Sequence, residues 1–226
     1  MPMEWAFPAD QKEGVYRAIY ERRDVRHFVT GAIAEEVLNR IIDAGLAAPS
    51  VGYMQPWRFV RIQQASLRED IFQLAECERQ QTAMALGERK EEFLRLKTDG
   101  IRECAEVIVV LLCNHRERYI FGRLSMPHMD LASASCAIQN MWLAARAEGI
   151  GLGWVSLFDP EKLRALVNAP SGAEPIAILC LGHVERFDER PLLETAGWDS
   201  QRERSDVLMA DQWITPMAGY SDKDSL

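Results

Sequence analysis

Residues 106–113 (EVIVVLLC) constrain the fold more than any other segment, because they form a continuous run of apolar and mostly β-branched residues. Such a run is typical of a central strand that is covered on both faces of a sheet. Further strands are predicted at residues 58–62, 152–158 and 175–184. Helices are predicted at residues 13–23, 34–48, 66–98, 129–148 and 161–166. Since helices alternate with buried strands, we expect an α/β or α+β fold with three layers around one sheet.

The chain has 226 residues, 48% hydrophobic and 27% charged, without a repeat or a Pro/Gly/Ser-rich linker. At ~150 residues per domain, this predicts a single domain over residues 1–226, with terminal arms of about 1–12 and 187–226. The net charge of -8 argues against general affinity for nucleic acid or anionic membranes. Five scattered cysteines without C-x-x-C spacing predict core thiols, and no signal peptide or long apolar run is present, so a cytoplasmic location is expected.

Residues 22–26 (RRDVR) place three guanidinium groups at the end of a predicted helix, with Arg22 and Arg26 expected on one face. Backbone carbonyls at a helix C-terminus disfavour an anion, so a phosphate bound here would be held by the arginine side chains. The alternative is a solvated basic helix end that is paired with Asp24 and Glu21.

Two other segments could border a ligand. Residues 48–57 (APSVGYMQPW) form an irregular loop that displays a hydroxyl, an amide and an aromatic edge, suited to a flat heterocycle or simply to an ordinary connection. In residues 149–156 (GIGLGWVS) the glycines follow a helix and open a strand. This order excludes a dinucleotide fingerprint and instead predicts a helix cap and a close backbone approach. Ser156 is expected within the strand, and the four histidines lack metal-ligand spacing, so no metal site is predicted.

From about residue 13 to residue 186, these segments in this order resemble the nitroreductase-like FMN flavoproteins. In that family an Arg-Arg-Ser-x-Arg motif binds the FMN phosphate, and a Pro-Ser loop reaches over from the other subunit of a homodimer. The resemblance implies an α+β fold, a three-layer α/β/α sandwich with a single central mixed sheet, and a homodimer with extended arms.

Asp24 stands at the usual Ser of the first motif, and Tyr53 at the usual Asn of the loop. Together with the MDLAS and NMWLAARAEGIGLGWVS segments, these differences resemble the BluB subfamily, the 5,6-dimethylbenzimidazole synthases. The resemblance implies that reduced FMN is a substrate, which O2 helps to fragment into 5,6-dimethylbenzimidazole and erythrose 4-phosphate for the cobalamin lower ligand. It also implies an external flavin reductase as partner.

The resemblance further implies catalytic roles for Asp24 and Ser156. The implied FMN-binding residues are Arg22, Arg23, Asp24, Val25, Arg26, Ser50, Met54, Gln55, Pro56, Gly153, Trp154 and Ser156. Neighbouring arginines should lower the pKa of Asp24, and the charged residues 86–97 are the expected lid. The alternatives are an FMN-dependent NAD(P)H nitroreductase or quinone reductase, with an open pocket for nicotinamide, and a flavin-storage protein.

Overall fold

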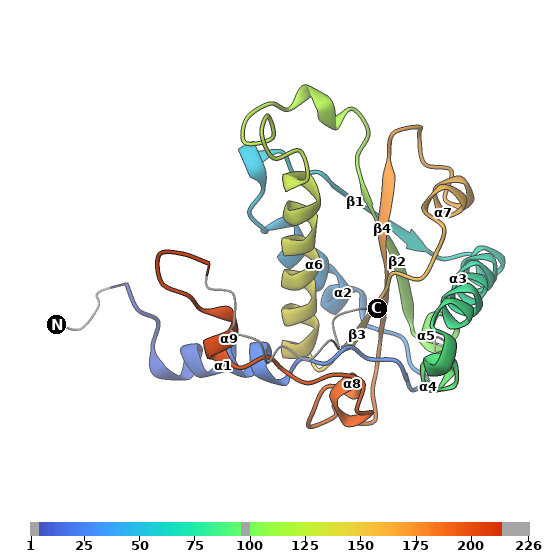
Figure 1. Ribbon diagram of the computed structural model, residues 1–226, viewed down its shortest axis with the longest axis horizontal. Helices are drawn as coiled ribbons and strands as arrows, with labels where there is room; N and C mark the ends of the chain where they lie inside the picture. Colours follow the sequence, from blue (N-terminus) through green and yellow to red (C-terminus); the bar gives the residue numbers. More distant parts are fainter. Residues whose placement is uncertain (1–4, 96–99, 214–226) are drawn as a thin grey trace.

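The computed structural model describes residues 5–95 and 100–213, and its centre is a four-stranded sheet (Figure 1). The strands are β1 (Trp57–Ile62), β2 (Glu106–Leu112), β3 (Gly151–Val155) and β4 (Glu174–Gly182), in the order β1-β2-β4-β3. Each neighbouring pair is antiparallel. The prediction of a mixed sheet is therefore wrong for these four strands, which form an antiparallel sheet. Parallel pairing occurs at an isolated bridge between Asp24 and Leu152.

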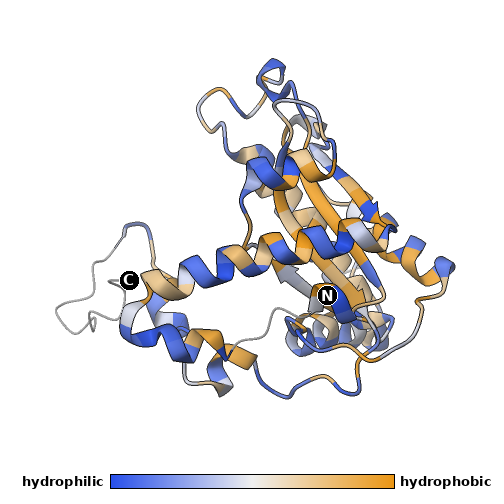
Figure 2. Cartoon of the chain, turned by 90° about the vertical axis from the view of Figure 1, so that its right-hand side faces the viewer, coloured by the Kyte–Doolittle hydropathy of each residue, from blue (hydrophilic) through white to orange (hydrophobic). Residues whose placement is uncertain are grey.

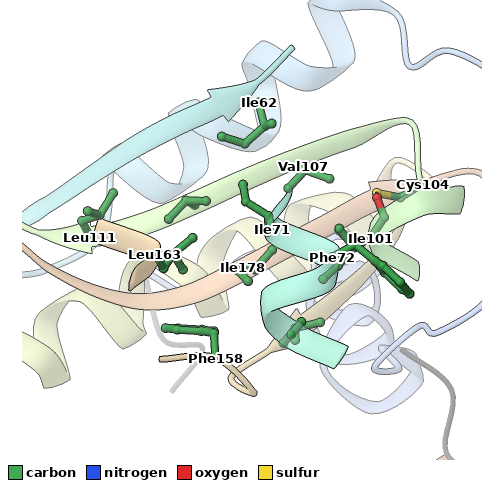
Figure 3. Packing of buried hydrophobic residues seen from close by; sticks show 14 of the residues in the cluster. Ile62, Ile71, Phe72, Ile101, Cys104, Val107, Leu111, Phe158, Leu163 and Ile178 are labelled. Atoms are coloured by element: carbon green, nitrogen blue, oxygen red, sulfur yellow. The ribbon is translucent and has the colours of Figure 1, made fainter. Parts of the chain in front are cut away.

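The central strand β2 is buried on both faces, as its composition predicted. Val107, Val109 and Leu111 pack into one hydrophobic cluster, whereas Ile108 and Val110 pack into the cluster on the opposite face. This alternation follows from the two-residue period of a strand. Figure 3 shows the first cluster, which receives side chains from the sheet and from the helices beside it.

Helices cover both faces of the sheet and give the predicted three layers. On one face lie α2 (Glu35–Leu46) and α6 (Met129–Ala147). On the other lie α3 (Ala65–Ala85), α5 (Gly100–Glu103) and α7 (Pro160–Leu166). In Figure 2 the strands are mainly orange, in keeping with their apolar environment. The α+β class and the α/β/α sandwich are confirmed.

The helical region predicted at residues 66–98 is broken in the structure. After α3, a 3₁₀ turn η2 (Gly87–Arg89) leads into the short helix α4 (Lys90–Leu94). The predicted end of this region at residues 96–98 lies outside the described residues. The remaining short elements are η1 (Val51–Tyr53), η3 (Arg116–Arg118), α8 (Leu192–Thr195) and α9 (Arg204–Val207).

The glycine after α6 caps this helix, as the sequence predicted. Gly149 has a positive φ of 73°. Its N–H donates to the Arg146 carbonyl at 3.2 Å, and the N–H of Ile150 donates to the Ala145 carbonyl at 2.8 Å. These two bonds form a Schellman motif, which satisfies carbonyls at the helix end. The chain thereby turns directly into β3.

The cysteines divide into buried and exposed thiols. Cys104 and Cys180 are buried, Cys113 is partly buried, and Cys77 and Cys136 are exposed. The prediction of core thiols is therefore wrong for Cys77 in α3 and Cys136 in α6, which are exposed. No helix among the described residues is long and apolar enough to cross a membrane. Of the expected terminal arms, residues 1–4 and 214–226 lie outside the described part of the chain.

Candidate active site

A cavity of about 1030 Å³ lies where four segments distant in the sequence meet. These segments are the end of α1 (Ala9–Glu21) with the residues after it, the α3–α4 region, the end of β3, and residues 189–201 beyond β4. Arg22, Arg23, Asp24 and Arg26 all line this cavity. The tertiary structure therefore gathers the predicted anion-binding side chains around one hollow.

The arginine segment is extended, not helical as predicted. Helix α1 ends at Glu21, and Arg22 has the extended angles φ -64° and ψ 146°. Arg22 and Arg26 therefore do not share a helical face. The extended conformation allows this segment to pair with β3, where the Val25 N–H donates to the Leu152 carbonyl at 3.1 Å.

Glycine in β3 makes this pairing possible. A Cβ atom on Gly153 would lie 2.2 Å from the Val25 carbonyl oxygen, well inside van der Waals contact. The close backbone approach predicted from the glycine pattern is thus confirmed. Gly153 and Val25 do not line the cavity; they fix the backbone that presents Asp24 to it.

Arg23 carries an unsatisfied hydrogen-bond donor. Its Nη1 donates to the carbonyls of Tyr20 at 2.8 Å and Arg22 at 2.7 Å, and its Nη2 donates to the Glu189 carbonyl. Its Nε is buried and has no hydrogen-bond partner among the described residues. A buried donor of this kind costs free energy unless it is paired.

The charges around the segment are only partly compensated. Arg26 forms an ion pair with Asp24, as the alternative of a self-paired helix end expected. Glu21, however, pairs with Arg17 and Arg146. Arg22 and Arg23 form no ion pair with a carboxylate in the described ranges. The cavity wall thus retains positive charge.

The Asp24 carboxylate is anchored at both oxygens. Its Oδ1 accepts from the Trp154 N–H at 2.9 Å, and its Oδ2 accepts from Arg26. Burial nevertheless raises the pKa of Asp24 above its ordinary value, because desolvation outweighs the attraction of Arg26 and Arg22. The prediction of a lowered pKa is therefore wrong: it counted the neighbouring charges and omitted burial.

Two further predicted residues line the cavity. Trp154 lies in β3 and borders both this cavity and a second hollow of about 470 Å³. Ser156 also lines the cavity, but it follows the last residue of β3, Val155, and its side chain is exposed. The prediction that Ser156 lies within the strand is corrected, because the strand ends where its pairing with β4 stops at Val155.

The predicted loop residues Ser50, Met54, Gln55 and Pro56 do not line the cavity of their own chain. Ser50 Oγ accepts from the Gln55 N–H at 3.0 Å, and Met54 and Pro56 are buried beneath the loop. Tyr53 is 83% exposed and has a positive φ of 53°, a backbone strain that is common at functional sites. Pro49, near the start of this loop, borders the second hollow together with Trp154.

The C-terminal segment supplies a wall that the sequence analysis missed. Trp198 lines the cavity beside Phe93 of α4, with ring centroids 6.3 Å apart. The Arg89 guanidinium lies 3.5 Å from the centroid of the Trp198 ring. The apolar residues and tryptophan of PLLETAGW, following β4, were the available signal. Of the predicted lid, Phe93 thus borders the site, whereas residues 96 and 97 lie outside the described residues.

The fold and the sequence define the class of protein. Residues 19–183 match the model of the nitroreductase family, and the chain belongs to this family. A solved iodotyrosine deiodinase bound to FMN and 3-iodo-L-tyrosine has the same fold, with a TM-score of 0.68 at 20% identity over 88% of this chain and all (100%) of that one. The NADPH:FMN oxidoreductase of Vibrio harveyi complexed with NAD+ has a TM-score of 0.67 at 19% identity, covering 89% and 79%.

Within the family, the sequence is similar to a particular enzyme. It is 36% identical over 199 residues to the 5,6-dimethylbenzimidazole synthase of Rhodospirillum rubrum, covering 87% of this chain and 94% of that protein. It is 37% identical over 196 residues to the synthase of Rhodobacter capsulatus, covering 85% and 94%. The resemblance seen in the sequence is thereby confirmed, and the family and these relatives together support an oxidoreductase enzyme.

Proposed function

We propose that this protein is a 5,6-dimethylbenzimidazole synthase, which uses O2 to fragment reduced FMN into 5,6-dimethylbenzimidazole and erythrose 4-phosphate for the cobalamin lower ligand. The observation that carries the proposal is the 36–37% identity to two synthases along almost their whole length. The cavity is the site of this reaction.

The described residues suit the phosphate of FMN. Arg22 and Arg23 bring positive charge to the cavity without a carboxylate partner in the described structure, and Arg23 Nε is a buried donor without an acceptor there. Guanidinium groups bind phosphate through charge-assisted hydrogen bonds. The cavity volume of about 1030 Å³ is at the upper end of ordinary small-molecule sites.

When bound in its reduced form, the flavin would supply the reaction with oxygen. Asp24 would hold and transfer a proton at its carboxylate, beside the phosphate-binding arginines. Its raised pKa brings it closer to the pH at which a general acid or base is most efficient. Ser156, exposed on the cavity wall, would hydrogen-bond to the flavin.

The remaining wall would exclude water. Phe93 and Trp198 present aromatic surface to the cavity. The Arg89 guanidinium lies over the Trp198 ring and donates to the Trp198 carbonyl, so it holds Trp198 in place. Water exclusion strengthens the electrostatic interactions within a site and prevents side reactions.

A second copy of the chain would complete the site as a homodimer. The loop at residues 50–56 is exposed at Tyr53 and does not line the main cavity of the same chain. Pro49 borders the second hollow, and Trp154 lines both this hollow and the main cavity. The partner's loop would cover the flavin. Reduced FMN would come from an external flavin reductase.

The test is an aerobic incubation of the purified protein with FMN, kept reduced by a separate flavin reductase and NADH. Chromatography and mass spectrometry should reveal 5,6-dimethylbenzimidazole in the presence of the protein and none in its absence. Complete recovery of FMN would contradict the proposal. NAD(P)H oxidation with an added nitroaromatic or quinone acceptor, beyond that of free flavin, would then identify a nitroreductase or quinone reductase, while its absence would favour flavin storage.

A further inference from the structure

The C-terminal end of α1 is an unfavourable place for an anion, because its last carbonyls carry partial negative charge. The cavity-lining arginines nevertheless follow this end directly. The structure shows how the carbonyls are covered. Arg23 covers those of Tyr20 and Arg22 with its own side chain. The carbonyls of Glu21 and Arg23 are covered from α6.

Trp142 on α6 makes two contacts with the arginine segment. Its indole Nε1–H donates to the Arg23 carbonyl at 3.0 Å. The Arg22 guanidinium lies 4.8 Å from the centroid of the Trp142 ring, within the range of a cation–π interaction. Trp142 thus donates a hydrogen bond to the Arg23 carbonyl and also holds the Arg22 guanidinium.

Arg146, four residues further along α6, acts beside it. Its Nε donates to the Glu21 carbonyl at 3.2 Å, and its guanidinium pairs with the Glu21 carboxylate. Residues four apart lie on the same helix face. The pair Trp142 and Arg146 therefore forms a ridge of donors against the end of α1.

The ridge also reaches the opposite side of the segment. Trp142 packs against Trp154, with ring centroids 6.2 Å apart and planes at 49°. The backbone N–H of Trp154 in turn donates to the Asp24 carboxylate at 2.9 Å. Arg22, the Arg23 carbonyl and Asp24 are therefore oriented by one pair of tryptophans.

We infer that Trp142 is a positioning residue for phosphate binding: it fixes Arg22 and removes the electrostatic penalty of the Arg23 carbonyl without touching the ligand. This inference rests on the proposed function, because it takes the anion to be the FMN phosphate. It predicts discrimination between FMN and riboflavin, which lacks the phosphate.

The experiment measures dissociation constants of oxidised FMN and riboflavin by quenching of flavin fluorescence. Trp142→Phe keeps a ring under Arg22 and loses the N–H, so FMN should bind about 5-fold more weakly. Trp142→Leu loses both contacts, so the loss should be about 10- to 30-fold. Riboflavin affinity should be unchanged in both variants. Trp213→Phe, at a residue 84% exposed and outside the cavity lining, is the matched control.

Equal weakening of FMN and riboflavin would overturn the inference, because it would assign Trp142 a packing role. Unchanged FMN binding in Trp142→Phe and Trp142→Leu would overturn it as well. If Trp142→Leu does not give a folded circular dichroism spectrum, Trp142→Phe alone decides. Failure of the wild-type chain to bind FMN would instead contradict the proposed function itself, so the two failures are distinguishable.

Discussion

Two segments with the composition of a flavin site have different positions in this chain. Arg22, Arg23, Asp24 and Arg26 line the cavity, whereas residues 50–56 lie outside it, where the Gln55 N–H donates to Ser50. The first segment is placed by backbone pairing with β3, beside Gly153. The second is placed by Ser133 of α6, whose Oγ accepts from the Val51 N–H at 3.0 Å. Segments with similar local composition can therefore differ in whether they line the cavity of their own chain.

The largest expected effect comes from the first segment. Asp24→Asn should lower the rate of product formation by about 100-fold or more, because it removes the carboxylate that we propose as the proton-transferring group. FMN binding should be retained, because the proposed phosphate-binding arginines are unchanged. Product analysis and flavin fluorescence measure the two properties separately. Asp43→Asn, at an exposed position on α2, should leave both unchanged. Normal product formation by Asp24→Asn would exclude the catalytic role.

Gly153→Ala should separate the first segment from β3. The new Cβ would clash with the Val25 carbonyl, which is backbone and cannot rotate away. We expect the free energy of unfolding, measured by denaturant titration, to fall by about 1–3 kcal/mol. FMN binding, measured by flavin fluorescence, should be weaker. Gly14→Ala in α1 has nothing within 4 Å of its Cβ and should instead stabilise the chain by about 0.5–1 kcal/mol. Equal stability of Gly153→Ala and wild type would show that the segment is not held by this contact.

Ser50→Ala tests the second segment. It removes the acceptor of the Gln55 N–H, so the free energy of unfolding should fall by about 1 kcal/mol. If the loop covers a partner's flavin, FMN affinity should fall as well, whereas Ser66→Ala, at an exposed residue of α3, should change neither quantity. A chain that sediments as a monomer in the presence of FMN would contradict the assignment of this loop to a second copy.

The smallest effect concerns pH. Because folding raises the pKa of Asp24, the folded chain binds this proton more tightly than the unfolded chain. The stabilisation is complete below the unfolded pKa, near 4, and is lost as the pH rises through the folded pKa. When the free energy of unfolding is measured from acid to neutral pH, the wild type should therefore lose stability relative to Asp24→Asn as the pH rises.

Asp159, the N-cap of α7, provides a control of opposite sign. Hydrogen bonds from the N–H groups of Lys162 and Glu161 lower its pKa. The contribution of Asp159 to the free energy of unfolding is present above the pKa of the unfolded chain. It is lost as the pH falls through the pKa of the folded chain. The same sign for Asp24→Asn and Asp159→Asn would contradict the raised pKa of Asp24.

The sequence by itself determined the layers of the fold and the positive charge of the segment after α1. The apolar run of residues 106–113 required a strand that is buried on both faces, and the glycines from Gly149 onward required a cap and a close approach. The three arginines of residues 22–26 indicated an anion from their charge alone. These properties depend on residue type and local spacing, which a sequence displays directly.

Only the tertiary structure decided how these parts meet. It showed that the arginine segment is extended, that burial reverses the expected pKa shift of Asp24, and that Trp198 and Trp142 approach the site from distant parts of the chain. Each of these depends on contacts between residues far apart in sequence. Desolvation and hydrogen-bond partners are properties of a residue's surroundings in space, and local sequence pattern does not specify them.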